Sequence, residues 1–79
     1  MSDLFEYQLI YLLELGAVKL VELVPAPDCW YVRINGCQWL RLSREGPHRF
    51  FPLEGTLAYL RDLGCGQVMV HLSTWADTP

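Results

Sequence analysis

The stretch CWYVRINGCQWLRL, residues 29–42, constrains the fold more than any other part of the chain. Asn35-Gly36 is a strong signal for a two-residue hairpin turn, because both central positions of such a turn need a positive φ. The flanking residues include Trp30, Tyr31, Val32, Ile34 and Trp39, which are β-branched or aromatic and favour strands on both sides of the turn. A two-residue turn would give three facing pairs: Ile34 with Cys37, Val32 with Trp39, and Trp30 with Arg41.

Both surfaces of this predicted hairpin carry large apolar groups. The register puts Trp30 and Trp39 on one surface, and Tyr31, Arg33 and Leu42 on the other. A sheet with one wet face alternates more cleanly between apolar and polar residues. Two arrangements explain the pattern: one helix covers each face of the sheet, or both helices lie on one face and leave the other for a dimer or a partner.

The rest of the chain predicts two helices and two more strands around the hairpin. In chain order the elements are a helix (3–15), a strand (17–25), the hairpin, a helix (52–63) and a strand (67–73). Gly16 and Gly64 mark the helix ends. We therefore expect an α+β fold of order α-β-β-β-α-β, with one four-stranded, mostly antiparallel sheet and two helices packed on it. Residues 1–79 would form one domain with a frayed tail at 74–79, apart from Trp75.

The first predicted helix is apolar nearly all round. Its central stripe is Phe5, Leu9, Leu12 and Leu13, but large apolar side chains also crowd its opposite side. Such a helix is either buried on two sides or available for association. The candidates for self-association are Tyr7, Ile10 and Tyr11.

Size and composition also point to association. A chain of 79 residues is near the lower limit for a self-sufficient core. Its 52% apolar and 19% charged residues give it more apolar surface than so small a sphere hides. The net charge of −3 disfavours nucleic-acid binding, yet residues 29–49 hold four arginines against Glu45 alone. Two explanations of these arginines stay open: they are ordinary solvated side chains, or they contact an acidic or phosphate-bearing partner.

Catalysis and metal binding find little support in the residue pattern. The three cysteines are Cys29, Cys37 and Cys65, and the histidines are His48 and His71. They show none of the paired spacings of metal sites, and no glycine-rich phosphate loop is present. We expect no cofactor, no metal and no enzyme. The odd cysteine count without a leader, and an apolar run too short to span a bilayer, predict a cytoplasmic protein with no membrane partner.

The stretch RFFPLEGTLAYLRDLGCGQVMVHLSTW, covering about a third of the chain, resembles small accessory proteins of plasmids and integrative elements, some of them ParC-type partition-associated proteins. In that pattern a basic-aromatic lead-in precedes a helix ending Leu-Arg-x-Leu-Gly and then an alternating strand. The matching residues here are Arg49, Phe50, Leu53, Leu57, Leu60, Arg61, Leu63, Gly64, Val68, Val70, Leu72 and Trp75. The resemblance implies a mobile genetic element and supplies no catalytic residue.

These observations together predict a non-catalytic protein-binding accessory or inhibitor module of a plasmid, integrative element or phage. The module would act either as a partition or maintenance accessory or as an anti-defence, anti-CRISPR-like inhibitor. The predicted partner-binding residues are three aromatic anchors and three rim arginines: Trp30, Tyr31, Trp39, Arg33, Arg41 and Arg44. The alternatives are a nucleic-acid-associated regulator using the arginine-bearing hairpin and, more distantly, a thiol-dependent enzyme.

Overall fold

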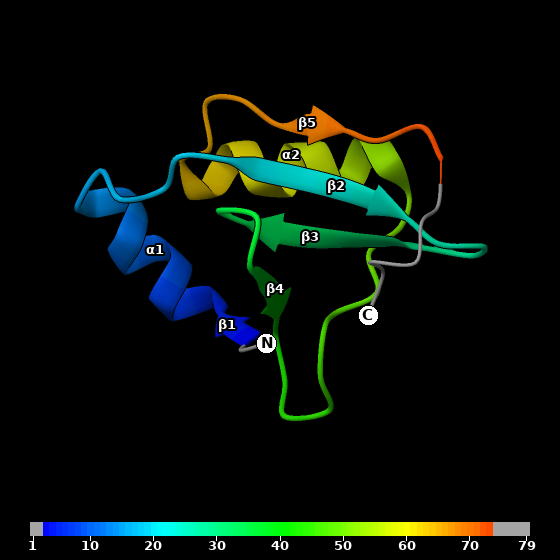
Figure 1. Ribbon diagram of the computed structural model, residues 1–79, viewed down its shortest axis with the longest axis horizontal. Coiled ribbons are helices and arrows are strands. Elements are labelled where there is room, and N and C mark those ends of the chain that lie inside the picture. The colour runs from blue at the N-terminus through cyan, green and yellow to red at the C-terminus, as the bar shows by residue number, and fades with distance from the viewer. Residues whose placement is uncertain (1–2, 74–79) are drawn as a thin grey trace.

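The computed structural model describes residues 3–73, and Figure 1 shows their arrangement. The elements are β1 (Asp3–Phe5), α1 (Glu6–Glu14), β2 (Val21–Pro25), β3 (Trp30–Ile34), β4 (Gln38–Arg41), α2 (Leu53–Leu63) and β5 (Met69–Val70). Two helices and one mixed sheet make this an α+β fold, which confirms the predicted class. The predicted fraying of the tail, and Trp75 with it, lies outside the described residues.

The sheet differs from the prediction in strand number and direction. Within residues 3–73 it has five strands in the order β1-β4-β3-β2-β5, not four. The central pairs β2–β3 and β3–β4 are antiparallel, but the edge strands β1 and β5 run parallel to β4 and β2. The prediction of a mostly antiparallel sheet is therefore wrong at both edges.

The additional strand is β1. The sequence predicted one helix over residues 3–15, and β1 takes the place of its first three residues. In the structure Leu4 is buried and lies beside Leu40 of β4, and the helix begins only at Glu6. The Phe5 N–H donates a hydrogen bond of 2.8 Å to the Gln8 side chain, which satisfies a backbone donor where strand turns into helix. The pairing of β1 joins residues more than thirty positions apart, so no local pattern announces it.

The hairpin register also differs from the prediction, by one residue. The turn has three residues, Asn35 to Cys37, and pairs Ile34 with Gln38 and Arg33 with Trp39. Asn35 and Gly36 do adopt positive φ angles of 55° and 71°, so the Asn-Gly signal located the turn correctly. The extra residue turns every β4 side chain to the opposite face. Trp30 and Trp39 therefore lie on opposite faces of the sheet, and the prediction that they share one is wrong.

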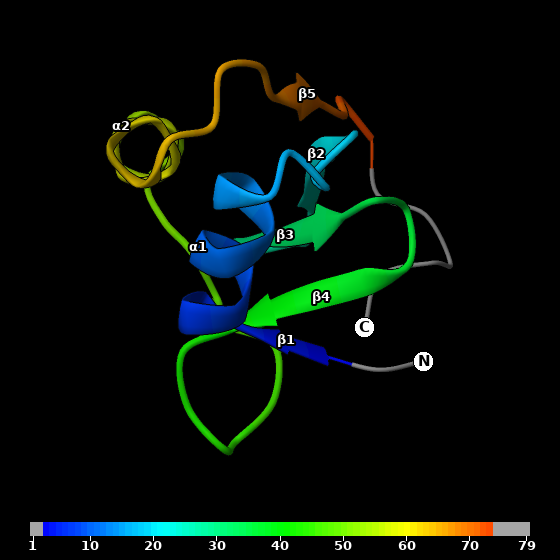
Figure 2. The same cartoon turned by 90° about the vertical axis from the view of Figure 1, so that its left-hand side faces the viewer.

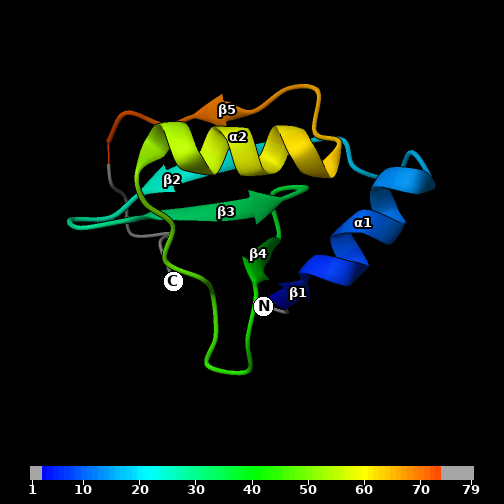
Figure 3. The same cartoon turned by 180° about the vertical axis from the view of Figure 1, so that it is seen from behind.

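Both helices lie on the same face of the sheet (Figures 2 and 3). That helix-covered face buries a layer of aliphatic residues: Leu4, Val21, Leu23, Val32, Ile34 and Leu40. From the helices, Leu9 of α1 and Leu60 of α2 are fully buried against it. α2 ends as predicted at Gly64, whose φ of 116° closes the helix in the left-handed region.

Candidate functional site

The opposite face, which we call the outer face, carries alternate residues of each strand. The register assigns to it Asp3, Phe5, Glu22, Val24, Tyr31, Arg33, Trp39, Arg41 and Met69. Neither α1 nor α2 covers this face within residues 3–73 (Figure 2). Four of the six predicted partner-binding residues lie here: Tyr31, Trp39, Arg33 and Arg41. Trp30 is on the helix-covered face, packed against the core.

Glu22 is the centre of a charged cluster on the outer face. Its carboxylate accepts two hydrogen bonds from Arg33, both 2.9 Å, and contacts Nε2 of His71 at 2.7 Å. The Arg33 hydrogen bonds hold the pKa of Glu22 below its usual range, against the opposing effect of burial. A carboxylate paired in this way stays ionised and is a poor general base. Neither Glu22 nor His71 was among the predicted site residues; the opposite charges of Glu22 and Arg33 become a signal once β2 is paired with β3.

Trp39 is enclosed by its neighbours on the same face. The Arg33 guanidinium lies 5.4 Å from its ring centroid, and the Tyr31 ring meets it edge-on at 6.0 Å. Only 3% of Trp39 is exposed. The predicted anchor and its predicted rim arginine thus contact each other, and Trp39 has little exposed surface to offer to a partner.

The remaining predicted arginines, Arg41 and Arg44, differ in their environments. Arg41 forms an ion pair of 3.2 Å with Asp3, donates to the Ser43 carbonyl oxygen, and stacks 4.9 Å from the Phe5 ring. Arg44 is exposed on the loop after β4, which extends away from the sheet (Figure 1). Arg44 therefore lies off the sheet, whereas the other five predicted partner-binding residues lie on its strands.

The predicted self-association residues are exposed together on one side of α1. Tyr7 is 70% and Tyr11 61% exposed, with Ile10 between them, while Leu9 of the same helix is fully buried. Leu15, which the sequence analysis did not single out, continues the stripe at 60% exposure. A groove of about 640 Å³ lies beside Tyr7, Ile10 and Tyr11, and its lining also includes Gln8, Leu12 and Glu14 of α1, Leu4 of β1 and Gln38 of β4. We call Tyr7, Ile10, Tyr11 and Leu15 the α1 stripe.

The cysteines differ sharply in their environments. Cys29 and Cys65 are buried, and burial raises the pKa of both thiols. Cys37 is exposed in the hairpin turn. A nucleophilic cysteine needs a lowered pKa, so the two buried thiols lack the property that catalysis requires.

The described residues contain neither a metal-binding cluster nor a membrane-spanning helix. Among residues 3–73, no three side chains of the His, Cys, Asp and Glu types gather closely enough to hold a metal ion. Neither helix in that range is long and apolar enough to cross a membrane. No protein-family model, curated protein or solved structure matches the chain.

Proposed function

We propose that this protein is a non-catalytic protein-binding module that acts by occupying the surface of a partner protein. The α1 stripe is the observation that carries the proposal. Contiguous exposed apolar groups with a polar border are typical of interaction surfaces, and monomeric proteins rarely leave large ones uncovered. Two tyrosines supply large contact area with a polar end, which suits interfaces that form and dissociate.

The predicted biological setting is a mobile genetic element, in which the module would serve as a partition or maintenance accessory or as an anti-CRISPR-like inhibitor of host defence. The resemblance of residues 49–75 to plasmid accessory proteins is its support. Both roles need a small protein that binds a larger assembly. Neither needs a catalytic group.

The alternative of a nucleic-acid-associated regulator has weaker support than protein binding. It relied on the hairpin arginines, but Arg33 and Arg41 direct their guanidinium groups to Glu22 and Asp3. A phosphate would have to compete with these carboxylates. Two results together would restore this alternative. The protein would have to retain DNA or RNA in a way that falls steeply as salt rises, and an Arg33→Glu/Arg41→Glu double variant would have to abolish that retention.

The test uses one substitution in the α1 stripe and one matched control. Tyr11→Asp places a charge in the stripe, whereas Phe51→Asp places one at another exposed aromatic position outside it, 74% exposed against 61% for Tyr11. The immobilised protein captures its partner from host lysate, and the purified partner is then titrated against each variant. We expect Tyr11→Asp to weaken binding at least 10-fold and Phe51→Asp to leave it unchanged.

Two results would contradict the proposal: equal binding by the Tyr11→Asp variant and the wild type, or capture of nucleic acid alone. Light scattering on the purified protein shows whether the partner is a second copy of the chain. A dimer that Tyr11→Asp dissociates would assign the stripe to self-association.

A further inference from the structure

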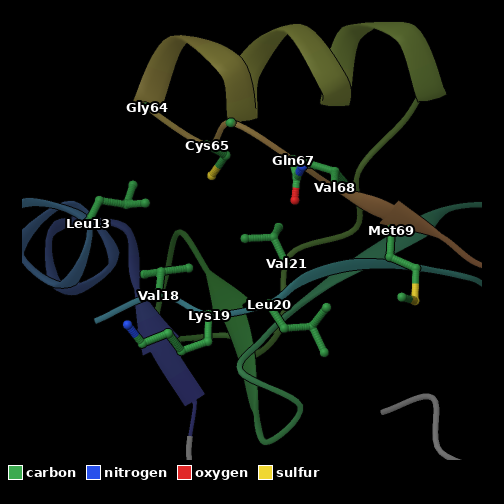
Figure 4. A pocket seen from close by; sticks show the side chains of 11 residues that line it. Leu13, Val18, Lys19, Leu20, Val21, Gly64, Cys65, Gln67, Val68 and Met69 are labelled. Carbon is green, nitrogen blue, oxygen red and sulfur yellow. The ribbon is translucent and has the colours of Figure 1, made fainter. Parts of the chain in front are cut away.

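A second surface feature, independent of the α1 stripe, is a hollow between β2 and β5 (Figure 4). Its volume is about 790 Å³, within the range of small-molecule sites. The main lining residues are Leu13, Val18, Val21, Cys65, Gln67 and Val68. Val21 and Cys65 are buried, whereas Gln67 is exposed, so the hollow has an apolar floor and a polar rim.

The hollow exists because two chain segments separate before they pair. β2 and β5 pair only through Glu22 with Met69 and Leu23 with Val70. Upstream of this pairing, residues 17–20 arrive from α1 and residues 64–68 arrive from α2. The space between the two segments opens over Val21, the first residue of β2.

Hydrogen bonds fix both walls of the hollow. The Asn35 side chain accepts from the backbone N–H groups of Lys19 and Leu20, at 2.6 and 3.2 Å, and donates to the Ala17 carbonyl at 3.1 Å. The opposite wall is held by the Cys65 N–H, which donates to the Leu60 carbonyl at 3.0 Å. The walls are thus positioned before any ligand arrives, which lowers the entropic cost of binding.

The charges around the hollow select the class of ligand. Both helices end beside it, and the C-terminal end of a helix carries partial negative charge, which disfavours an anion. Lys19 is the only charged residue among those lining it, and its ammonium group donates to the Gly16 carbonyl at 3.0 Å, which disfavours a second cation. Burial raises the pKa of the Cys65 thiol, as expected at a floor of low polarity.

We propose that the β2–β5 hollow is a binding site for a neutral, apolar small molecule that carries a hydrogen-bond donor. The apolar floor takes the body of the ligand, and the Gln67 amide accepts a hydrogen bond from its polar group. In Figure 4 the Cys65 sulfur and the Gln67 side chain point into the space that Leu13, Val18 and Val21 border. The site shares no residue with the α1 stripe.

Two fluorescent probes test the site and its preference for a neutral ligand. N-phenyl-1-naphthylamine is neutral, apolar and carries one N–H donor, and 8-anilinonaphthalene-1-sulfonate has the same ring system with an added sulfonate. We expect the neutral probe to bind saturably at one site and the sulfonate to bind at least 10-fold more weakly. Equal affinity of the two probes, or no saturable binding of the neutral one, would overturn the proposal.

Substitutions at Gly66 locate the probe. A Cβ built at Gly66 meets no atom within 4 Å, so the backbone at this position accepts a side chain without a steric clash at Cβ. Gly66→Trp and, from the facing wall, Val18→Trp are expected to weaken the neutral probe at least 10-fold by filling the hollow. Gly66→Ala, which is too small to fill it, should bind normally. Unchanged binding by both tryptophan variants would place the probe elsewhere and refute the site.

Thiol labelling gives a second readout that needs no substitution. The neutral probe should slow alkylation of Cys65 by N-ethylmaleimide at least 10-fold and leave the exposed Cys37 unaffected. Equal rates for Cys65 with and without probe would contradict binding in the hollow. Neither outcome depends on whether the α1 stripe binds a protein.

Discussion

Substitution of Asn35 tests how the hairpin turn supports the segment that leads into β2. Its side chain makes three hydrogen bonds to residues 17–20, two of them partly buried and one exposed. At about 0.5–1.5 kcal/mol for each net hydrogen bond, with the exposed one at the low end, their loss costs about 2 kcal/mol. Asn35 also has a φ of 55°, a conformation that costs an alanine about 1 kcal/mol more.

Three variants separate these contributions. Asn35→Gly removes the hydrogen bonds but tolerates the positive φ, so we expect a loss of about 2 kcal/mol in the free energy of unfolding. Asn35→Ala adds the backbone strain, for a total of about 3 kcal/mol. Asn35→Asp keeps the acceptor and loses only the donor to Ala17, and should cost about 1 kcal/mol. For a domain whose total stability is on the order of 5 kcal/mol, all three are measurable.

Urea unfolding followed by tryptophan fluorescence gives the free energies, and hydrogen exchange gives the local effect. The backbone amides of Lys19 and Leu20 should exchange faster in Asn35→Gly than in the wild type, because their acceptor is gone. An Asn35→Gly variant within about 0.5 kcal/mol of the wild type would refute the role of the side chain, since the net worth of even one hydrogen bond is about that large. Equal stability of the glycine and alanine variants would refute the strain contribution alone.

Three further predictions concern single groups. Glu22→Gln should cost about 2–3 kcal/mol at pH 7. Because the pKa of Glu22 is lowered from 4.5, this stabilisation is present above pH 4.5 and disappears as pH falls through the folded-state pKa. Urea unfolding at several pH values checks this, and the same loss of stability in acid for Glu22→Gln as for the wild type would contradict it. Burial, and then the hydrogen bond that Tyr59 donates to Glu6, raise the pKa of Tyr59. An absorbance titration should therefore show one tyrosine ionising after the others, and Tyr59→Phe should remove that late fraction. Simultaneous titration of all tyrosines would argue against this. In the native protein Cys37 should react with N-ethylmaleimide at least 10-fold faster than Cys29, whose pKa burial raises; faster reaction at Cys29 would favour the thiol-enzyme alternative.

Local signals in the sequence determined several parts of this structure. Gly64 ends α2 in the left-handed conformation, which glycine adopts easily because it has no Cβ. Asn35-Gly36 forms the turn because both residue types tolerate the positive φ angles that it requires. The apolar periodicity of α1 separated the buried Leu9 from the exposed Tyr7 and Tyr11. Each of these depends on residues within a few positions of one another, which the sequence displays directly.

The candidate sites needed information that no local pattern contains. One additional residue in the hairpin turn moved Trp39 beside Arg33, and so joined a predicted anchor to a predicted rim residue. The strand β1 depends on the pairing of Leu4 with Leu40 on the neighbouring strand β4. Placement of both helices on one face, and the gap that became the β2–β5 hollow, likewise follow from contacts between distant segments. Sequence periodicity states which side of an element is apolar, but only tertiary packing decides what covers that side.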